Sequence, residues 1–134
     1  ANMLLPECGR VLFTIEDKDK NVVLPLADRF AKIGYRIFAT RCTADFLRQN
    51  GLHATKVSKI GEEDSNDPAI IKLLMNNEVD LVINTMSHDQ EMSSDGFVIR
   101  QTAIEHNIAL LTSLNTADAL LRALENRSFA TESL

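Results

Sequence analysis

The sequence predicts a single α/β domain with an open, doubly wound, five-stranded parallel sheet flanked by helices. Five short apolar runs alternate along the chain with five segments whose apolar residues recur at the helical period. The apolar runs show no clean polar alternation, as expected of strands buried on both faces. This order is typical of parallel strands joined by right-handed helical crossovers.

The predicted strands are rich in Val, Ile, Leu, Phe and Thr, and comprise residues 11–15, 36–40, 54–57, 81–85 and 109–112. Capping residues, proline and glycine set the ends of the helices between them. Pro25 fits the first turn of the first helix if Asn21 is its N-cap, whereas an earlier start would place the proline where it disturbs the helix. Gly34 ends that helix. Gly51 ends a second helix over 43–50.

The third helix is predicted to start at Asp67 and Pro68, a cap residue followed by proline, and Asp95 is predicted to cap the fourth. Helical periodicity gives each helix a buried face. These faces comprise Val22, Val23, Leu26, Ala27, Phe30 and Ala31 in the first helix, Phe46 and Leu47 in the second, Ile70, Ile71, Leu74 and Met75 in the third, Val98, Ile99, Thr102 and Ala103 in the fourth, and Ala117, Leu120, Leu121 and Leu124 in the last.

Length and composition fit one globular domain. The chain has 134 residues, of which 45% are hydrophobic and 25% charged. We expect the domain to occupy residues 9–134, with residues 1–8 a linker or an expression remnant and the residues after Arg127 a tail. No run approaches the length of a membrane span and no signal peptide is visible, so we expect a cytoplasmic protein without membrane contact.

Charge and cysteine content narrow the functional classes. The net charge is −5, Trp is absent, and Lys and Arg form no block, which argues against a nucleic-acid surface. Cys8 and Cys42 lack the spacing of metal ligands, and we expect two free thiols.

Polar side chains gather where the predicted strands end. These residues are Thr14, Thr40 with Thr43, Lys59, Asn84 with Thr85, and Thr112 with Ser113, and Lys20 lies shortly after the first strand. Ligands of such sheets bind outside the carboxyl ends of the strands. Hydroxyl, amide and ammonium groups at helix starts suit a phosphate. Strand and capping preferences explain any one of these residues, but their recurrence at one edge favours a binding site.

Signs of catalysis or metal binding are weak. His88 follows the fourth strand on the correct side of the sheet, but no nucleophile or paired base accompanies it. The sequence lacks GxGxxG and P-loop signatures, and its acidic segment 61–67 lacks the ligand spacing of a calcium loop. We therefore predict no catalytic residue and no metal ligand.

Several motifs, in order, resemble the methylglyoxal synthase-like domain, and more narrowly the C-terminal regulatory (allosteric) domain of the large subunit of glutamine-dependent carbamoyl phosphate synthetase. They are Gly9-Arg10-Val11-Leu12-Phe13-Thr14-Ile15, Asp19-Lys20, Ala39-Thr40-x-x-Thr43, Val57-Ser58-Lys59, Asp80-Leu81-Val82-Ile83-Asn84-Thr85, Asp95-Gly96-Phe97-Val98-Ile99-Arg100-Gln101-Thr102-Ala103 and Thr112-Ser113-Leu114-Asn115-Thr116-Ala117. Each motif alone is weak, but their order and spacing are specific.

The resemblance implies a regulatory domain without activity of its own. The parent would be an ATP-dependent ligase that makes carbamoyl phosphate from glutamine and bicarbonate for pyrimidine and arginine biosynthesis. Its ATP and divalent metal sites and its glutaminase small subunit would lie outside this sequence. The effector would be a nucleotide-type phosphate such as UMP, IMP or phosphoribosyl pyrophosphate. By resemblance its ligands are Lys20, Thr40, Thr43, Lys59, Asn84 and Thr85, to which Arg41, Thr14, Thr112 and Ser113 are candidate additions.

Two departures from the family pattern fall at the expected phosphate pocket. Cys42 stands where the family often has glycine, and Met86 stands where it commonly has Thr or Pro. They predict a weakened nucleotide response or a different effector, with Arg41 as a compensating charge.

Two alternative functions remain open. The first is a methylglyoxal synthase-type phosphate lyase, whose Gly-Gly-Asp element should fall where this chain has Gly61-Glu62-Glu63-Asp64. The second is a degenerate domain with a purely structural role. The residues do not identify the effector or whether it activates or inhibits. They also do not distinguish the arginine from the pyrimidine pathway or give the oligomeric state.

Overall fold

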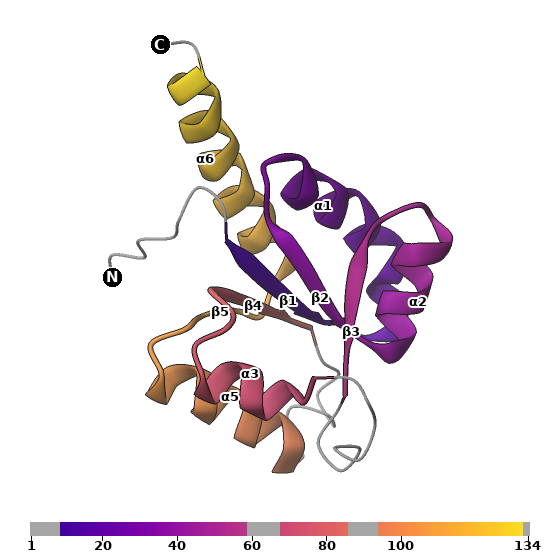
Figure 1. The fold of residues 1–134 in the computed structure, drawn as a ribbon, viewed down its shortest axis with the longest axis vertical. Helices are drawn as coiled ribbons and strands as arrows, with labels where there is room; N and C mark the ends of the chain where they lie inside the picture. Colours follow the sequence, from indigo (N-terminus) through magenta and orange to yellow (C-terminus); the bar gives the residue numbers. More distant parts are fainter. Residues whose placement is uncertain (1–8, 59–67, 86–93, 133–134) are drawn as a thin grey trace.

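The computed structural model describes residues 9–58, 68–85 and 94–132 (Figure 1). Its five parallel strands form one sheet in the order β3-β2-β1-β4-β5. The strands are β1 (Arg10–Thr14), β2 (Arg36–Thr40), β3 (Ala54–Val57), β4 (Leu81–Asn84) and β5 (Ala109–Leu111). The predicted doubly wound fold is confirmed, and each strand end lies within one residue of its predicted position.

Helices cover both faces of the sheet. They are the 3-10 helix η1 (Asp17–Asp19) and the α-helices α1 (Lys20–Lys32), α2 (Arg41–Gln49), α3 (Ile70–Met75), α5 (Ser94–Glu105) and α6 (Leu114–Glu132). α1, α2 and α6 pack on one face, and α3 and α5 on the other (Figure 1). The described part of the chain is therefore a three-layer α/β/α sandwich.

Each strand contributes to two separate apolar cores, one on each face. Val11 and Phe13 of β1 point toward α1, α2 and α6, whereas Leu12 points toward α3 and α5. All three are completely buried. This double burial explains why the strand sequences show no polar alternation.

Every described helix that leads into a strand ends in a left-handed residue: Gly34 after α1, Gly51 after α2, Asn77 after α3 and Asn107 after α5. After α1, the Gly34 N–H donates to the Ala31 carbonyl at 3.0 Å and the Tyr35 N–H to the Phe30 carbonyl at 2.9 Å. This pair of bonds is the Schellman motif, which reverses the chain within two residues. The predicted stops at Gly34 and Gly51 are confirmed.

The start of α1 differs from the prediction. The N-cap residue is Asp19, not Asn21, so Pro25 lies inside the helix. Proline lacks an N–H, and the helix therefore loses one internal hydrogen bond at this point. The helix continues because Val23 and Phe30 on either side of Pro25 are completely buried.

α3, in contrast to α1, begins later than predicted. Its first residue is Ile70, and Pro68 lies outside the helix; Asp67 falls outside the described residues. The Pro68 carbonyl accepts a hydrogen bond from the Ser58 N–H at 2.8 Å, and Ala69 forms a parallel bridge with Ser58. Pairing beside the end of β3 therefore replaces the first helical turn.

Other helix predictions also need correction. α5 begins at Ser94, so Asp95 lies within the helix instead of capping it. α6 runs to Glu132, so residues 128–132 are helical and not part of a tail. Val22, Met75 and Val98 are 53%, 56% and 39% exposed, although periodicity placed them on buried faces. The buried stripes are narrower than predicted because each helix contacts the sheet along one side only.

Candidate functional site

The strand order creates a topological switch point between β1 and β4. The chain leaves β1 toward β2 on one side, while β4 pairs with the other side of β1. Crossovers that depart in opposite directions open a crevice at the carboxyl ends of the two strands, where such sheets bind ligands. Thr14 and Asn84 are register partners at this point.

The buried polar side chains of the described residues all lie at this edge of the sheet. They are Thr14, Thr40, Thr43, Ser58, Asn84 and Thr85, each no more than 8% exposed. Each ends a strand or follows its end within three residues. Burying polar groups is costly unless they are hydrogen-bonded, so a cluster confined to one edge indicates a function there.

Two hydrogen bonds join Thr14, Asn84 and Thr85, which we call the switch-point cluster, and a third links Thr85 to Glu16. The Thr14 hydroxyl donates to Asn84 Oδ1 at 2.7 Å, and the Thr85 N–H donates to the Thr14 carbonyl at 3.0 Å. The Glu16 N–H donates to Thr85 Oγ1 at 3.1 Å. The side-chain oxygens of Asn84 and Thr85 thus each accept one hydrogen bond within the protein.

Two hydroxyl groups lie beside the cluster, at the end of β2. Thr40 is the N-cap residue of α2 in extended backbone, yet its side chain makes no capping hydrogen bond. Among the described residues the Thr43 hydroxyl has no hydrogen bond either. No buried side-chain oxygen or nitrogen in the described ranges lacks a partner. The two hydroxyls therefore keep a small exposed area, although Thr40 and Thr43 as whole residues are only 7% and 1% exposed.

The predicted cations have different outcomes. Lys20 is the half-buried first residue of α1, and Arg41 is the exposed first residue of α2, so both lie at helix starts on the carboxyl edge. Lys59 lies outside the described residues. Helix N-termini carry unsatisfied N–H groups and a partial positive charge, which favour anions.

The end of β5 contributes less to the edge. Thr112 is exposed, and Ser113 is half-buried. The Ser113 Oγ accepts a hydrogen bond from the Asn115 N–H at 3.2 Å, which is the interaction of an N-cap serine with α6. Helix capping thus accounts for Ser113 without a ligand.

The model of the MGS-like domain family matches residues 22–112. This chain belongs to the MGS-like domain family. The solved structure of methylglyoxal synthase from Elizabethkingia anophelis NUHP1 has a TM-score of 0.66 to this chain and 18% sequence identity, and the match covers 87% of this chain and 79% of that one. At this identity the likeness establishes a common fold. The broader of the two resemblances seen in the motifs is thereby confirmed.

The family match covers most of the candidate site. Thr40, Thr43, Asn84 and Thr85 lie within the matched segment, whereas Thr14 and Lys20 precede it. Gly61 to Asp64, Met86 and His88 fall in the match but outside the described residues. The carboxyl edge of the MGS-like domain is thus described for β1, β2 and β4.

Ser58 is a further buried polar residue at this edge and was not among the predicted site residues. This residue directly follows β3 and is only 2% exposed. Its hydroxyl donates to the Pro68 carbonyl at 3.4 Å, so it closes the edge beside β3. The rule that selected Thr40 also applies to Ser58, because Ser58 comes directly after a predicted strand.

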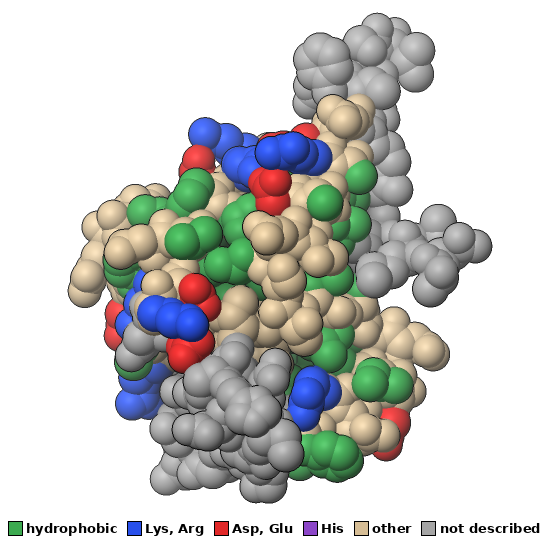
Figure 2. All heavy atoms as spheres, turned by 180° about the vertical axis from the view of Figure 1, so that it is seen from behind, with side chains coloured by type: hydrophobic (Ala, Val, Ile, Leu, Met, Phe, Trp, Pro, Cys, Tyr) green, Lys and Arg blue, Asp and Glu red, His purple; other side chains and the backbone are tan. Residues whose placement is uncertain are grey.

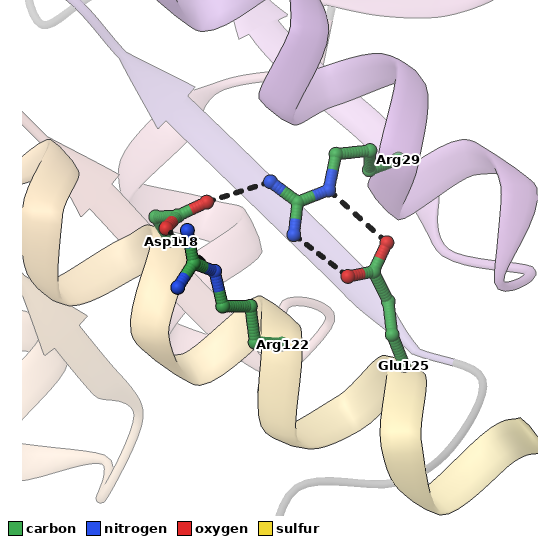
Figure 3. Close-up of polar contacts among 4 residues, drawn as sticks. All are labelled: Arg29, Asp118, Arg122 and Glu125. Atoms are coloured by element: carbon green, nitrogen blue, oxygen red, sulfur yellow. Dashed lines mark hydrogen bonds and ion pairs between the residues drawn. The ribbon is translucent and has the colours of Figure 1, made fainter.

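The groups with shifted pKa values in the MGS-like domain hold helices in place. Arg29 of α1 reaches α6, where it bonds Asp118 at 2.6 Å and Glu125 at 2.7 and 3.1 Å (Figure 3). Hydrogen bonds from Arg29 lower the pKa of both carboxyl groups. A hydrogen bond from Lys56 likewise lowers the pKa of Asp45. These pairs stabilise α6 against α1 and β3 against α2.

The remaining surface features are few. On the described part of the face in Figure 2, acidic and basic side chains lie beside one another instead of forming a patch of one sign. Within the described ranges, no three His, Cys, Asp or Glu residues are grouped to hold a metal ion. No helix in these ranges is long and apolar enough to cross a membrane.

Proposed function

We propose that this MGS-like domain is the regulatory domain of the large subunit of a glutamine-dependent carbamoyl phosphate synthetase. It binds a phosphate-bearing nucleotide-type effector of the UMP, IMP or phosphoribosyl pyrophosphate class at the carboxyl ends of β1, β2 and β4. The supporting observation is the set of six buried polar side chains confined to that edge.

The chemistry of the edge suits a phosphate because its available groups are hydrogen-bond donors. The Asn84 oxygen and the Thr85 oxygen are occupied by Thr14 and Glu16. The Asn84 amide hydrogens and the Thr85 hydroxyl hydrogen remain to be donated to a ligand. A phosphate offers oxygen acceptors and negative charge, and the starts of α1 and α2 favour that charge.

The regulatory assignment rests on the motif resemblance together with this donor-rich edge. In this proposal the effector changes how the domain contacts the rest of the large subunit and, through it, the glutaminase subunit. The ligase chemistry, with its ATP and divalent metal, belongs to the parent enzyme in the cytoplasm. The domain alone has no synthetase activity. An ATP-grasp domain encoded directly upstream would identify that parent.

A phosphate lyase of the methylglyoxal synthase type is the second candidate, and the similarity to the solved methylglyoxal synthase favours it. Its substrate, dihydroxyacetone phosphate, would use the same phosphate donors, so the two functions differ in whether a catalytic base is present. This chain has Gly61-Glu62-Glu63-Asp64 where the lyase is expected to have Gly-Gly-Asp, which is why we prefer the regulatory function.

One experiment separates the candidates. The purified chain is titrated with UMP, IMP and phosphoribosyl pyrophosphate by calorimetry and thermal shift, and incubated with dihydroxyacetone phosphate while methylglyoxal is measured. Effector binding without methylglyoxal release supports the regulatory function. Methylglyoxal release that is lost in Asp64→Asn supports the lyase. If the chain binds no effector and releases no methylglyoxal, the purely structural role is the remaining candidate.

A further inference from the structure

We infer that Thr14 is a positioning residue, whose hydroxyl fixes the orientation of the Asn84 side-chain amide and thereby makes the site selective for ligands rich in hydrogen-bond acceptors. The ligand class in this inference rests on the proposed function. The role of Thr14 does not, because it is a property of the protein without ligand.

The geometry of the pair is tightly constrained. Thr14 and Asn84 are register partners on adjacent strands and are 7% and 3% exposed. The hydroxyl-to-Oδ1 distance is 2.7 Å, the usual length of an O–H···O hydrogen bond and shorter than the usual N–H···O bond, so the amide oxygen and not the amide nitrogen faces Thr14. The Thr85 N–H donates to the Thr14 carbonyl at 3.0 Å, which holds the two strand ends together just beyond the pair.

An asparagine amide has nearly the same shape after a half-turn about its last bond, so hydrogen bonds decide which end points where. The Thr14 hydroxyl donates its single hydrogen to Oδ1. This bond directs the oxygen into the protein and leaves the two amide hydrogens as the groups that Asn84 offers. Among the described residues, no other hydrogen bond holds the Asn84 side chain.

Thr85 also favours ligands that present hydrogen-bond acceptors. Its oxygen accepts the Glu16 N–H at 3.1 Å, so its remaining group is again a donor. A phosphate oxygen can accept from both side chains. A ligand that presents an N–H or O–H there faces donor hydrogens, and the two oxygens already accept one hydrogen bond each inside the protein, which disfavours that ligand. The selectivity therefore comes from bonds inside the protein and not from charge alone.

Thr14→Val tests this role because valine keeps the shape of threonine and removes the hydroxyl. Without the bond, the Asn84 amide populates both orientations, and one of them turns a lone pair toward the phosphate. The matched variants are Thr14→Ser, which restores the hydroxyl, and Thr102→Val. Thr102 lies on α5, where its hydroxyl bonds the Val98 carbonyl at 2.7 Å.

Two measurements are made on each variant. The Asn84 side-chain amide is followed by nuclear magnetic resonance without ligand, and affinities for UMP, uridine and inorganic phosphate are measured by calorimetry. We expect Thr14→Val to broaden the amide signals and to weaken UMP and phosphate binding about tenfold, the effect of one lost hydrogen bond. The preference for UMP over uridine should fall, whereas Thr14→Ser and Thr102→Val should match the natural chain.

Unchanged amide signals and affinities in Thr14→Val would overturn the inference. Equal losses in Thr14→Ser and Thr14→Val would also overturn it, because the threonine methyl group would then be responsible. If the natural chain binds none of the probes, the proposed function fails while the amide signals still decide the role of Thr14.

Discussion

The amino and carboxyl edges of the sheet differ in how far their polar groups are paired within the protein. At the amino edge, Asp80 accepts the Arg10 N–H at 2.8 Å, the Arg10 side chain donates to the Asn77 carbonyl at 3.3 Å, and the Asn77 amide donates to the His106 carbonyl at 3.1 Å. Donors and acceptors there satisfy one another. At the carboxyl edge the acceptors are used and donors remain.

With the proposed function, this difference places stability and binding at opposite edges of one sheet. The amino edge contains the left-handed turns that return the chain to each strand, so its changes should alter the free energy of unfolding. The carboxyl edge contains the buried polar cluster, so its changes should alter ligand affinity. Substitutions at Asn84 and Lys20 test the carboxyl edge, and a substitution at Gly51 tests the amino edge.

The largest effect is expected from Asn84→Asp. The change replaces the two amide donors with a carboxylate oxygen and places negative charge where the phosphate should bind. UMP affinity should fall by about 100-fold or more, because a charge-assisted donor is lost and a repulsive group is gained. Calorimetry measures the loss. Asn76→Asp adds the same charge at the end of α3 and should bind UMP normally. Equal affinities in the two variants would move the site away from β4.

Lys20→Ala should have the next largest effect on binding. The lysine is the first residue of α1 at the carboxyl edge, and losing its ammonium should weaken phosphate binding by about 1–3 kcal/mol. The natural chain should lose more affinity with added salt than the variant. Lys32→Ala is the control, because Lys32 ends the same helix and is 74% exposed. The same test applies to Lys59, which lies outside the described residues. Unchanged calorimetric titrations for Lys20→Ala would remove it from the site.

On the opposite edge, Gly51→Ala should reduce stability and leave affinity unchanged. Gly51 has φ +86, and an added Cβ would meet nothing within 4 Å. The cost is therefore the backbone strain of a left-handed alanine, about 1–2 kcal/mol in urea unfolding. Gly51→Asn should recover much of it, since the chain itself uses Asn77 and Asn107 in this conformation. A drop in UMP affinity in Gly51→Ala would show that the two edges are coupled.

The fold could be predicted from the sequence because its strongest signals are local. Strands buried on both faces leave continuous apolar runs, and Gly34 and Gly51 mark helix ends by their backbone freedom. Asn77 and Asn107 adopt the same left-handed conformation at helix ends. They do not mark a helix end in the sequence as clearly as glycine does, since asparagine is also common in loops. The position of Pro25 inside α1 follows from tertiary packing, which local preference does not contain.

The candidate site could be predicted only as a set of strand ends. Parallel strands end on one edge, so Thr40 and Asn84 were expected to share it. The bond from Thr14 to Asn84 joins residues 70 apart in the chain, and it depends on β1 pairing with β4 in one register. The composition of a strand determines neither its place in the strand order nor its register. Ser58 was missed although the same rule selects it.

A smaller effect on stability is expected from the ion pairs between α1 and α6, and it should depend on pH. Hydrogen bonds from Arg29 lower the pKa of Asp118 and Glu125 below their ordinary values of 3.8 and 4.5. Their contribution is therefore present above those values and is lost as the pH falls through the lower pKa values of the folded protein.

Arg29→Met tests these pairs. At neutral pH it should lower the melting temperature by less than Gly51→Ala does, because the side chains remain about a third exposed. The difference from the natural chain should shrink as the pH is lowered below about 4. Arg122→Met, which removes a 72% exposed partner of Asp118, should do less. A difference that persists at the lowest pH would point to lost packing of the arginine stem.

The smallest effect is expected from Cys42, the exposed second residue of α2. If Cys42 and Met86 narrow the phosphate pocket, the natural chain binds UMP poorly, and Cys42→Gly with Met86→Thr should strengthen binding. Because the Cys42 side chain already faces solvent, we expect a gain of only about two- to fivefold, less than the tenfold of one hydrogen bond. The glycine should also cost about 1 kcal/mol of stability within the helix.

Arg41 provides the competing explanation, since it is the exposed first residue of the same helix and brings a positive charge to the edge. If this charge already compensates, the natural chain binds UMP tightly, Arg41→Ala weakens binding in a salt-dependent way, and the double variant gains nothing. Titration of the natural chain, Arg41→Ala and the double variant with UMP at two salt concentrations separates the two explanations. Tight binding by the natural chain without a gain in the double variant would reject the narrowed pocket, and the donor-rich cluster at β1 and β4 would remain the basis of binding.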